Sequence, residues 1–181
     1  MTEYRVSIRY ARALLELAKQ SQSAEAVLND LLQVSETIKS SRELSSFIQN
    51  PVIMPDKKKN VFADLFKEKI GKLTYDFLML TAEKDREVLI TSIAEQYEVA
   101  YNAEFNRTKV KIITAKPIEQ TLKDSMVDKL SECFKSVILP SFVVDKTAIG
   151  GVIIKVNDKI IDGSIKNKLS KMRSDLIMGN K

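Results

Sequence analysis

Asp162, Gly163 and Ser164 form a short sequence that superficially resembles a nucleophile presented on a turn. A serine nucleophile needs a neighbouring base, most often histidine, and a recognisable flanking pattern. The chain contains no histidine, and the flanking pattern is missing. Asp162 or Ser164 is therefore interpreted as the cap of a following helix, since both residue types favour that position.

Two other groups of residues suggest phosphate binding but have the wrong pattern. Gly150 and Gly151 do not form a phosphate loop, because no Gly-Lys-Ser/Thr sequence follows them. They are interpreted as part of a strand over Ile149–Val156, where glycine marks a bulge or the close approach of another backbone. Lys57-Lys58-Lys59 is interpreted as the solvated start of a helix.

The remaining candidates for chemistry are isolated. Cys133 is the single cysteine, so it cannot form an internal disulfide, and without histidine it cannot belong to a zinc cluster. It is interpreted as a small apolar residue on a helix, in a protein of a reducing compartment. Asp145 and Asp162 are far apart in the sequence, and nothing pairs them as an acid–base couple. We therefore expect no catalytic residue, no metal site and no cofactor.

The composition favours helices and two modules. Apolar residues make up 44% of the 181 residues, and five glycines with four prolines are too few for a sandwich of many tight turns. Residues 1–106 carry 14 basic and 16 acidic side chains, whereas residues 107–181 carry 15 basic and 8 acidic ones. The net charge is therefore −2 in the first part and +7 in the second, so nucleic acid, an acidic protein and a membrane surface are all open as partners of the second part.

No targeting or membrane-spanning segment is expected from the sequence. Residues 1–9 lack the apolar run of a secretory signal, and an Arg- and Ser-rich transit peptide is also missing, which favours a bacterial protein over an organelle precursor. No apolar run approaches the roughly 20 residues that span a bilayer as a helix.

Residues 4–20 show the periodicity of a helix with an unusually wide apolar surface. At 100° per residue, one apolar stripe and a second one lie on nearly opposite sides, whereas an ordinary surface helix needs a stripe of roughly 100°. We therefore expect this helix to be covered on two sides. The first stripe is Ile8, Ala11, Leu15 and Ala18, and the second is Tyr10, Ala13, Leu14 and Leu17.

Five more helices are expected before residue 107. Residues 73–84 are apolar on every side of a helix, because Phe77-Leu78-Met79-Leu80 are consecutive. The ladder Leu89, Ile93, Tyr97, Tyr101 and Phe105 is interpreted as core and not as a base-stacking platform. The expected helices are 4–20, 24–39, 43–48, 55–70 closed by Gly71, 73–84, and 85–106.

The pattern changes to alternating and β-branched residues after Asn106. The sequence therefore predicts a helical module over 1–106 and a small α/β module over 107–181. The second module is expected to contain strands at 108–115, 137–145, 149–156 and 159–161, a turn at Asn157-Asp158, and helices at 118–135 and from Ser164 onward. The last helix carries Ile165, Leu169, Met172 and Leu176 in one apolar row.

Several short motifs together resemble one known family over nearly the whole chain. The most specific part runs from Asp145 to Leu169. The chain is similar to the delta subunit of bacterial F-type ATP synthases, called the oligomycin-sensitivity-conferring protein in mitochondria. The matching residues are Arg9–Leu14, Phe47–Pro51 with Ile53, Arg86 with Leu89, Ile93 and Tyr97, and then Asp145, Ile149–Gly151, Ile161–Ile165 and Leu169.

This resemblance implies a non-catalytic stator subunit with two partners, at the cytoplasmic face of the bacterial membrane through its complex. A six-helix bundle would bind the N-terminal helix of one alpha subunit in a groove between its first and fifth helices. Carried over by position, the groove residues are Tyr10, Ala13, Phe77 and Leu80. The C-terminal domain would engage the paired b subunits of the peripheral stalk, and Ile165, Leu169, Met172 and Leu176 are the candidate residues.

A basic helical adaptor that binds nucleic acid is the alternative hypothesis. The net charge of +7 after residue 106 supports it. Its basic residues are spread over strands and helices, and Phe134 and Phe142 are the only aromatic residues there to stack on bases. The sequence therefore favours protein partners over nucleic acid.

Overall fold

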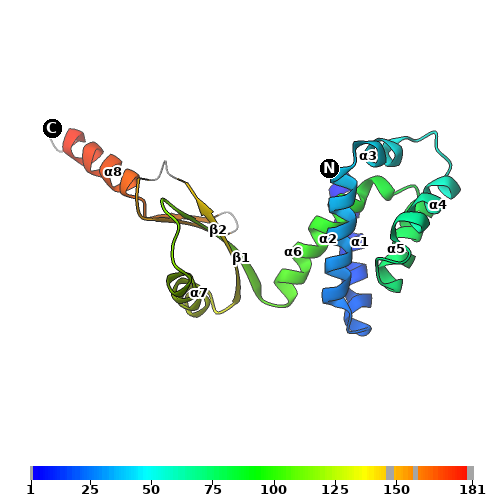
Figure 1. Ribbon diagram of the computed structural model, residues 1–181, viewed down its shortest axis with the longest axis horizontal. Coiled ribbons are helices and arrows are strands. Elements are labelled where there is room, and N and C mark those ends of the chain that lie inside the picture. The colour runs from blue at the N-terminus through cyan, green and yellow to red at the C-terminus, as the bar shows by residue number, and fades with distance from the viewer. Residues whose placement is uncertain (1, 146–148, 157–158, 179–181) are drawn as a thin grey trace. The chain divides into compact units, whose positions relative to one another are not determined.

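The computed structural model describes residues 2–145, 149–156 and 159–178, and they form two compact units that divide between Glu104 and Phe105 (Figure 1). The first unit is helical and the second combines helices with a four-stranded sheet. The expected mainly α fold, with a small α/β part at the C-terminal end, is confirmed. The expected turn at Asn157-Asp158 lies outside the described residues.

The helices of the first unit agree with the periodicity of the sequence, apart from the end of the fourth helix and the start of the last one. A 3₁₀ turn at Glu87–Leu89 precedes the last helix, which was expected to begin at Asp85. Pro55 is the first residue of its helix, as its fixed backbone favours. The helices are α1 (Thr2–Gln20), α2 (Ala24–Ser40), α3 (Arg42–Gln49), α4 (Pro55–Phe66), α5 (Lys72–Glu83) and α6 (Ile90–Glu104).

Gly71 begins α5 and does not close α4, so that expectation was wrong. Helix α4 ends at Phe66, and Gly71 has an extended backbone at the N-cap of α5. The carboxylate of Asp30 on α2 accepts hydrogen bonds of 2.8 Å from the Gly71 N–H and from the Thr74 hydroxyl. A side chain 41 residues away therefore caps α5, and a local sequence pattern cannot reveal it.

Two apolar clusters form the core of the first unit, and α5 lies between them. Phe77 belongs to the cluster that α1, α2 and α6 build, whereas Leu78 and Ala82 belong to the cluster that α3 and α4 help to build. Tyr97 of α6 is fully buried and donates a 3.0 Å hydrogen bond to the Ala24 carbonyl, which connects α6 to α2. Burial of its phenol raises the pKa of Tyr97 well above its ordinary value.

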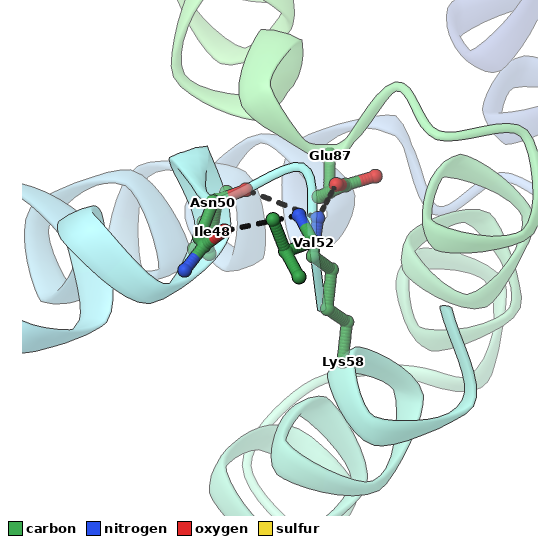
Figure 2. A network of polar contacts seen from close by, with 5 residues as sticks. All are labelled: Ile48, Asn50, Val52, Lys58 and Glu87. Carbon is green, nitrogen blue, oxygen red and sulfur yellow. Dashed lines mark hydrogen bonds and ion pairs between the residues drawn. The ribbon is translucent and has the colours of Figure 1, made fainter. Parts of the chain in front are cut away.

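A buried ion pair also lies inside this unit, where the sequence analysis expected a solvated lysine. The side chain of Lys58 on α4 is 3% exposed and that of Glu87 in the 3₁₀ turn is 2% exposed (Figure 2). The Lys58 ammonium donates hydrogen bonds to Glu87 Oε1 and, at 3.3 Å, to the carbonyl of Ile48 at the end of α3. One cation therefore connects three elements, and the interpretation of Lys57–Lys59 as uniformly solvated was wrong.

The second unit is built on a sheet of order β2-β1-β3-β4. Strand β1 (Arg107–Thr114) is central, pairs in parallel with β2 (Val137–Val144) and is antiparallel to β3 (Val152–Val156). Helix α7 (Gln120–Phe134) connects β1 to β2 (Figure 1). Its apolar side chains pack against those of the sheet. Strand β4 (Lys159–Asp162) pairs with β3, and α8 (Ile165–Met178) follows.

Strand β2 lies at one edge of this sheet and contains Pro140 opposite Val110. Proline has no backbone N–H, so it is tolerated where a strand has a neighbour on one side. Strand β3 begins at Val152, later than expected, because Gly151 has a left-handed backbone with φ of +83°. The two glycines therefore precede the strand.

We expect the loss of one member of the Lys58–Glu87 pair to destabilise the first unit much more than the loss of both members. Lys58→Met leaves a buried, unpaired carboxylate, which should lower the free energy of unfolding of the first unit by about 3–5 kcal/mol. Lys58→Met combined with Glu87→Met removes both charges and should recover most of this loss. Urea unfolding followed by tyrosine fluorescence measures it, because all five tyrosines lie before residue 102. A double variant as unstable as the single one would contradict the prediction.

Candidate docking surfaces

The described residues offer contact surfaces with exposed apolar side chains. Within the described ranges, no group of three or more His, Cys, Asp or Glu side chains could hold a metal ion. Cys133 lies on helix α7, as interpreted from the sequence, and is exposed. None of the described helices is long and apolar enough to cross a membrane. The candidate sites are therefore surfaces with exposed apolar side chains.

The first surface lies where α1 and α5 meet. The rings of Tyr10 and Phe77 contact each other edge to face, with centroids 6.2 Å apart. Tyr10 is half-buried and Phe77 is buried in the core, so Phe77 contributes more to the floor of this surface than to its rim. Ala13 and Leu80 are exposed, and Leu80 leaves 44% of its surface open.

Helical spacing extends this surface along both helices. Leu17 lies seven residues after Tyr10 on the same side of α1, and 52% of its surface is exposed. Leu80 lies three residues after Phe77 on the same side of α5. We call Tyr10, Ala13, Leu17, Phe77 and Leu80 the α1–α5 surface. The structure brings the four predicted residues to one region and adds Leu17, which the sequence analysis assigned to the same stripe.

The apolar character of α5 has an explanation inside the chain. Its buried residues face the two core clusters on different sides of the helix, as the sequence analysis expected for a helix covered on more than one face. Most of its apolar surface is therefore used within the unit. Leu80 is the large apolar side chain that α5 leaves exposed.

A second groove, between α1 and α6, was missed by the sequence analysis. It has a volume of about 590 Å³, and Ile8, Leu15 and Ala100 contribute apolar side chains to it. The Lys19–Glu104 ion pair bridges the two helices at its end. The sequence contained one sign of this groove: Val99 is an apolar residue outside the buried ladder of α6. In the structure, Val99 is 62% exposed.

The third surface is the apolar row of α8. Ile165, Leu169, Met172 and Leu176 are between 44% and 75% exposed. They recur every three to four residues, so they lie on one side of the helix. Lysines at positions 166, 168 and 171 and Arg173 are exposed beside this row. The structure therefore confirms the helix, and its apolar row remains largely exposed among the described residues.

The start of α8 is fixed by the residues that superficially resembled a nucleophile. The Asp162 carboxylate accepts a 2.9 Å hydrogen bond from the Ser164 N–H, and Ser164 Oγ accepts one of 3.2 Å from the Asn167 N–H. Hydrogen bonds from the side chain and backbone of Ser164 hold the pKa of Asp162 below its ordinary value. The interpretation of Asp162 and Ser164 as caps is confirmed.

Gly150 and Gly151 allow the backbone before β3 to approach the backbone before α8. The Gly163 N–H donates to the Val152 carbonyl and the Ile165 N–H donates to the Gly150 carbonyl, both at 3.0 Å. A Cβ atom at Gly151 would lie 2.4 Å from the Gly163 carbonyl oxygen. The expected close approach of another backbone is confirmed.

The comparisons with known proteins agree with this fold and these surfaces. The family described as ATP synthase delta (OSCP) subunit matches residues 6–176. The ATP synthase subunit delta of Desulforamulus reducens is 36% identical over 172 residues, which cover 95% of each chain. That of Acetivibrio thermocellus is 32% identical over 173 residues, covering 95% of this chain and 97% of the relative.

A solved structure shares the fold. A chain of the mitochondrial ATP synthase hexamer of Toxoplasma gondii matches 94% of this chain and 97% of its own length, with a TM-score of 0.70 and 20% identity. The protein belongs to the ATP synthase delta (OSCP) subunit family. It is a structural subunit with a stator role in the peripheral stalk, as the sequence motifs indicated.

We expect Gly151→Ala to destabilise the second unit by about 1–3 kcal/mol, because alanine at a positive φ is strained and its Cβ meets a backbone oxygen. Gly150→Ala is the matched control, since its Cβ would meet the mobile end of the Ile165 side chain. Far-UV circular dichroism during urea unfolding measures the loss. Tyrosine fluorescence reports the first unit alone and should not change. Equal effects of the two substitutions would contradict the argument.

Proposed function

We propose that this protein attaches the catalytic head of the ATP synthase to its peripheral stalk through two separate surfaces. The α1–α5 surface binds the N-terminal helix of an alpha subunit. The apolar row of α8 binds the b subunits of the stalk. The protein associates with the cytoplasmic face of the bacterial membrane through this complex and makes no membrane contact of its own.

The observation that carries this proposal is that each compact unit has its own exposed apolar side chains, on α1 and α5 in the first unit and in a row along α8 in the second. Leu17 and Leu80 are exposed in the first unit, and Leu169, Met172 and Leu176 are exposed in the second. Complete burial of one such side chain contributes about 1.5–3 kcal/mol. A partner helix that covers one of these rows therefore gains several kcal/mol from apolar contact, in the manner of a helix bound in a groove.

The separation of the two surfaces suits a mechanical function. A stator holds the head still against the torque of the rotor, so it needs firm attachment at two places and a body that stays folded between them. The first unit has two apolar clusters and a buried ion pair in its core.

The α1–α5 surface is tested by placing a charge on its rim. Leu80→Asp and Tyr10→Asp would each place a carboxylate against an apolar helix, which costs several kcal/mol when the charge is buried without a partner. We expect binding of an alpha-subunit N-terminal peptide to weaken at least about 100-fold, since each factor of ten corresponds to about 1.4 kcal/mol. Isothermal titration calorimetry measures this.

Val99→Asp is the control for this experiment, because Val99 is exposed beside the other groove of α1. It should leave the affinity for the peptide unchanged. Circular dichroism must show intact helicity for each variant. Full affinity in Leu80→Asp, or an equal loss in Val99→Asp, would place the alpha-subunit site elsewhere.

The α8 surface is tested in the same chain with a second readout. Leu169→Asp and Met172→Asp should abolish retention of the b subunits in a pull-down while alpha-peptide binding stays intact, because the two rows lie in different units. Ser170→Asp adds the same charge to an exposed polar position of α8 and should have no effect. Loss of both partners in Leu169→Asp would contradict the assignment of one partner to each unit.

A further inference from the structure

Two lysines lie directly opposite each other on the face of the sheet that α7 does not cover. Lys111 of β1 and Lys155 of β3 are partners in the antiparallel register. Opposite residues in such a pair extend from the same face of the sheet, and like charges there destabilise it. The α7 side of the sheet carries Val110, Ile112 and Val156 instead, so the lysine pair occupies the other face.

Among the described residues, no ion pair relieves this repulsion. Within the described part of the chain, neither ammonium group forms an ion pair, and both side chains are exposed. Their other neighbours in the same row are Ser141 on β2 and Ile160 on β4. The nearest described carboxylate by register is that of Asp162, and it accepts a hydrogen bond from the Ser164 N–H at the start of α8.

The same face contains a recess with apolar walls. It has a volume of about 700 Å³ and is lined by Lys111, Lys155, Leu139 and Pro140, together with residues of the adjoining strand positions. Leu139 is half-buried, and Ile160 is exposed at the far side of the lysine row. The two lysines therefore lie between an apolar side chain on one side, Leu139, and another on the opposite side, Ile160.

We propose that this face, the lysine-pair face (Lys111, Leu139, Ser141, Lys155 and Ile160), binds an acidic amphipathic helix of a partner protein. Four neighbouring strands span about 14 Å at about 4.8 Å each. That width accommodates an α-helix of about 10–12 Å diameter. Carboxylates of the helix would lie between the two ammonium groups, and its apolar side chains would contact Leu139 and Ile160.

The structure favours a protein helix over a nucleic acid or a membrane. Phe134 and Phe142 pack in the cluster on the α7 side, so no described aromatic ring is available here for base stacking. The apolar wall at Leu139 is recessed, whereas insertion into a bilayer needs side chains that protrude. This surface is distinct from the apolar row of α8 and does not depend on what α8 binds.

The proposal is tested with the full chain and a synthetic probe. The probe is an 18-residue helical peptide with Glu and Leu on one face and Ala, Ser and Gln elsewhere; the control peptide has Gln in place of Glu. We expect the Lys111→Gln/Lys155→Gln variant to bind the acidic probe at least tenfold more weakly than the unchanged chain. Lys166→Gln/Lys168→Gln on α8 should change the affinity less than twofold. Equal losses in the two variants, or equal binding of the two peptides, would overturn the proposal.

A second variant separates binding from folding. Lys155→Glu places opposite charges across the pair, so it should raise the unfolding temperature of the second unit by a few degrees and abolish probe binding. A lowered unfolding temperature would show that Lys155 is needed for packing and would overturn the proposal. A nucleic acid and a membrane are tested with a 20-nucleotide thymidine strand and phosphatidylglycerol vesicles at about 0.15 M salt. The proposal would be overturned if either bound tightly, if Lys111→Gln/Lys155→Gln abolished that binding, and if the same variant left probe binding unchanged.

Discussion

The first unit depends on the complete burial of one face of α6. Ile90 of this face packs in the cluster with α3 and α4, whereas Ile93 and Tyr97 pack in the cluster with α1 and α2. Helix α6 therefore joins the two cores, as α2 and α5 also do. The hydroxyl of Tyr97 also donates a hydrogen bond to the Ala24 carbonyl, so the same face connects α6 to the start of α2. The exposed rows of α1 and α5 keep their positions because the helices beneath them are fixed in this way.

The order of the helices and strands could be predicted because it follows from local periodicity. Helices α1 and α2 have apolar residues at helical spacing, and β1 alternates, so a window of ten to twenty residues is sufficient. The motifs near Gly151 and Asp162 could also be interpreted, since close approach and capping are properties of single residue types. The exposed row of α8 could be predicted for the same reason, because period and spacing determine which side of a helix a residue occupies. Phe77, carried over from the family resemblance, is instead buried in the core.

The remaining features depend on contacts between distant segments. The cap of α5 comes from Asp30, and the partner of Lys58 lies 29 residues further along the chain. The repulsive pair of Lys111 and Lys155 depends on the register of two strands. No local sequence pattern distinguishes Lys58 from the exposed Lys57. Lys58 is buried because α3 and the 3₁₀ turn pack against its side chain. The sequence analysis therefore predicted well which side of a helix or strand a residue occupies, and poorly which distant residues contact each other.

The edge strand β2 has a further consequence for the subunit before it joins its complex. Seven of its eight residues are apolar or small, and a flat edge of this kind is a template for pairing with another copy. Pro140 removes one backbone donor in the middle of the strand and prevents a continuous ladder along this edge. A chain synthesised in excess of its partners would then stay monomeric at this edge instead of forming intermolecular sheets. Pro140 in β2 therefore contributes to the resistance of the free subunit to aggregation.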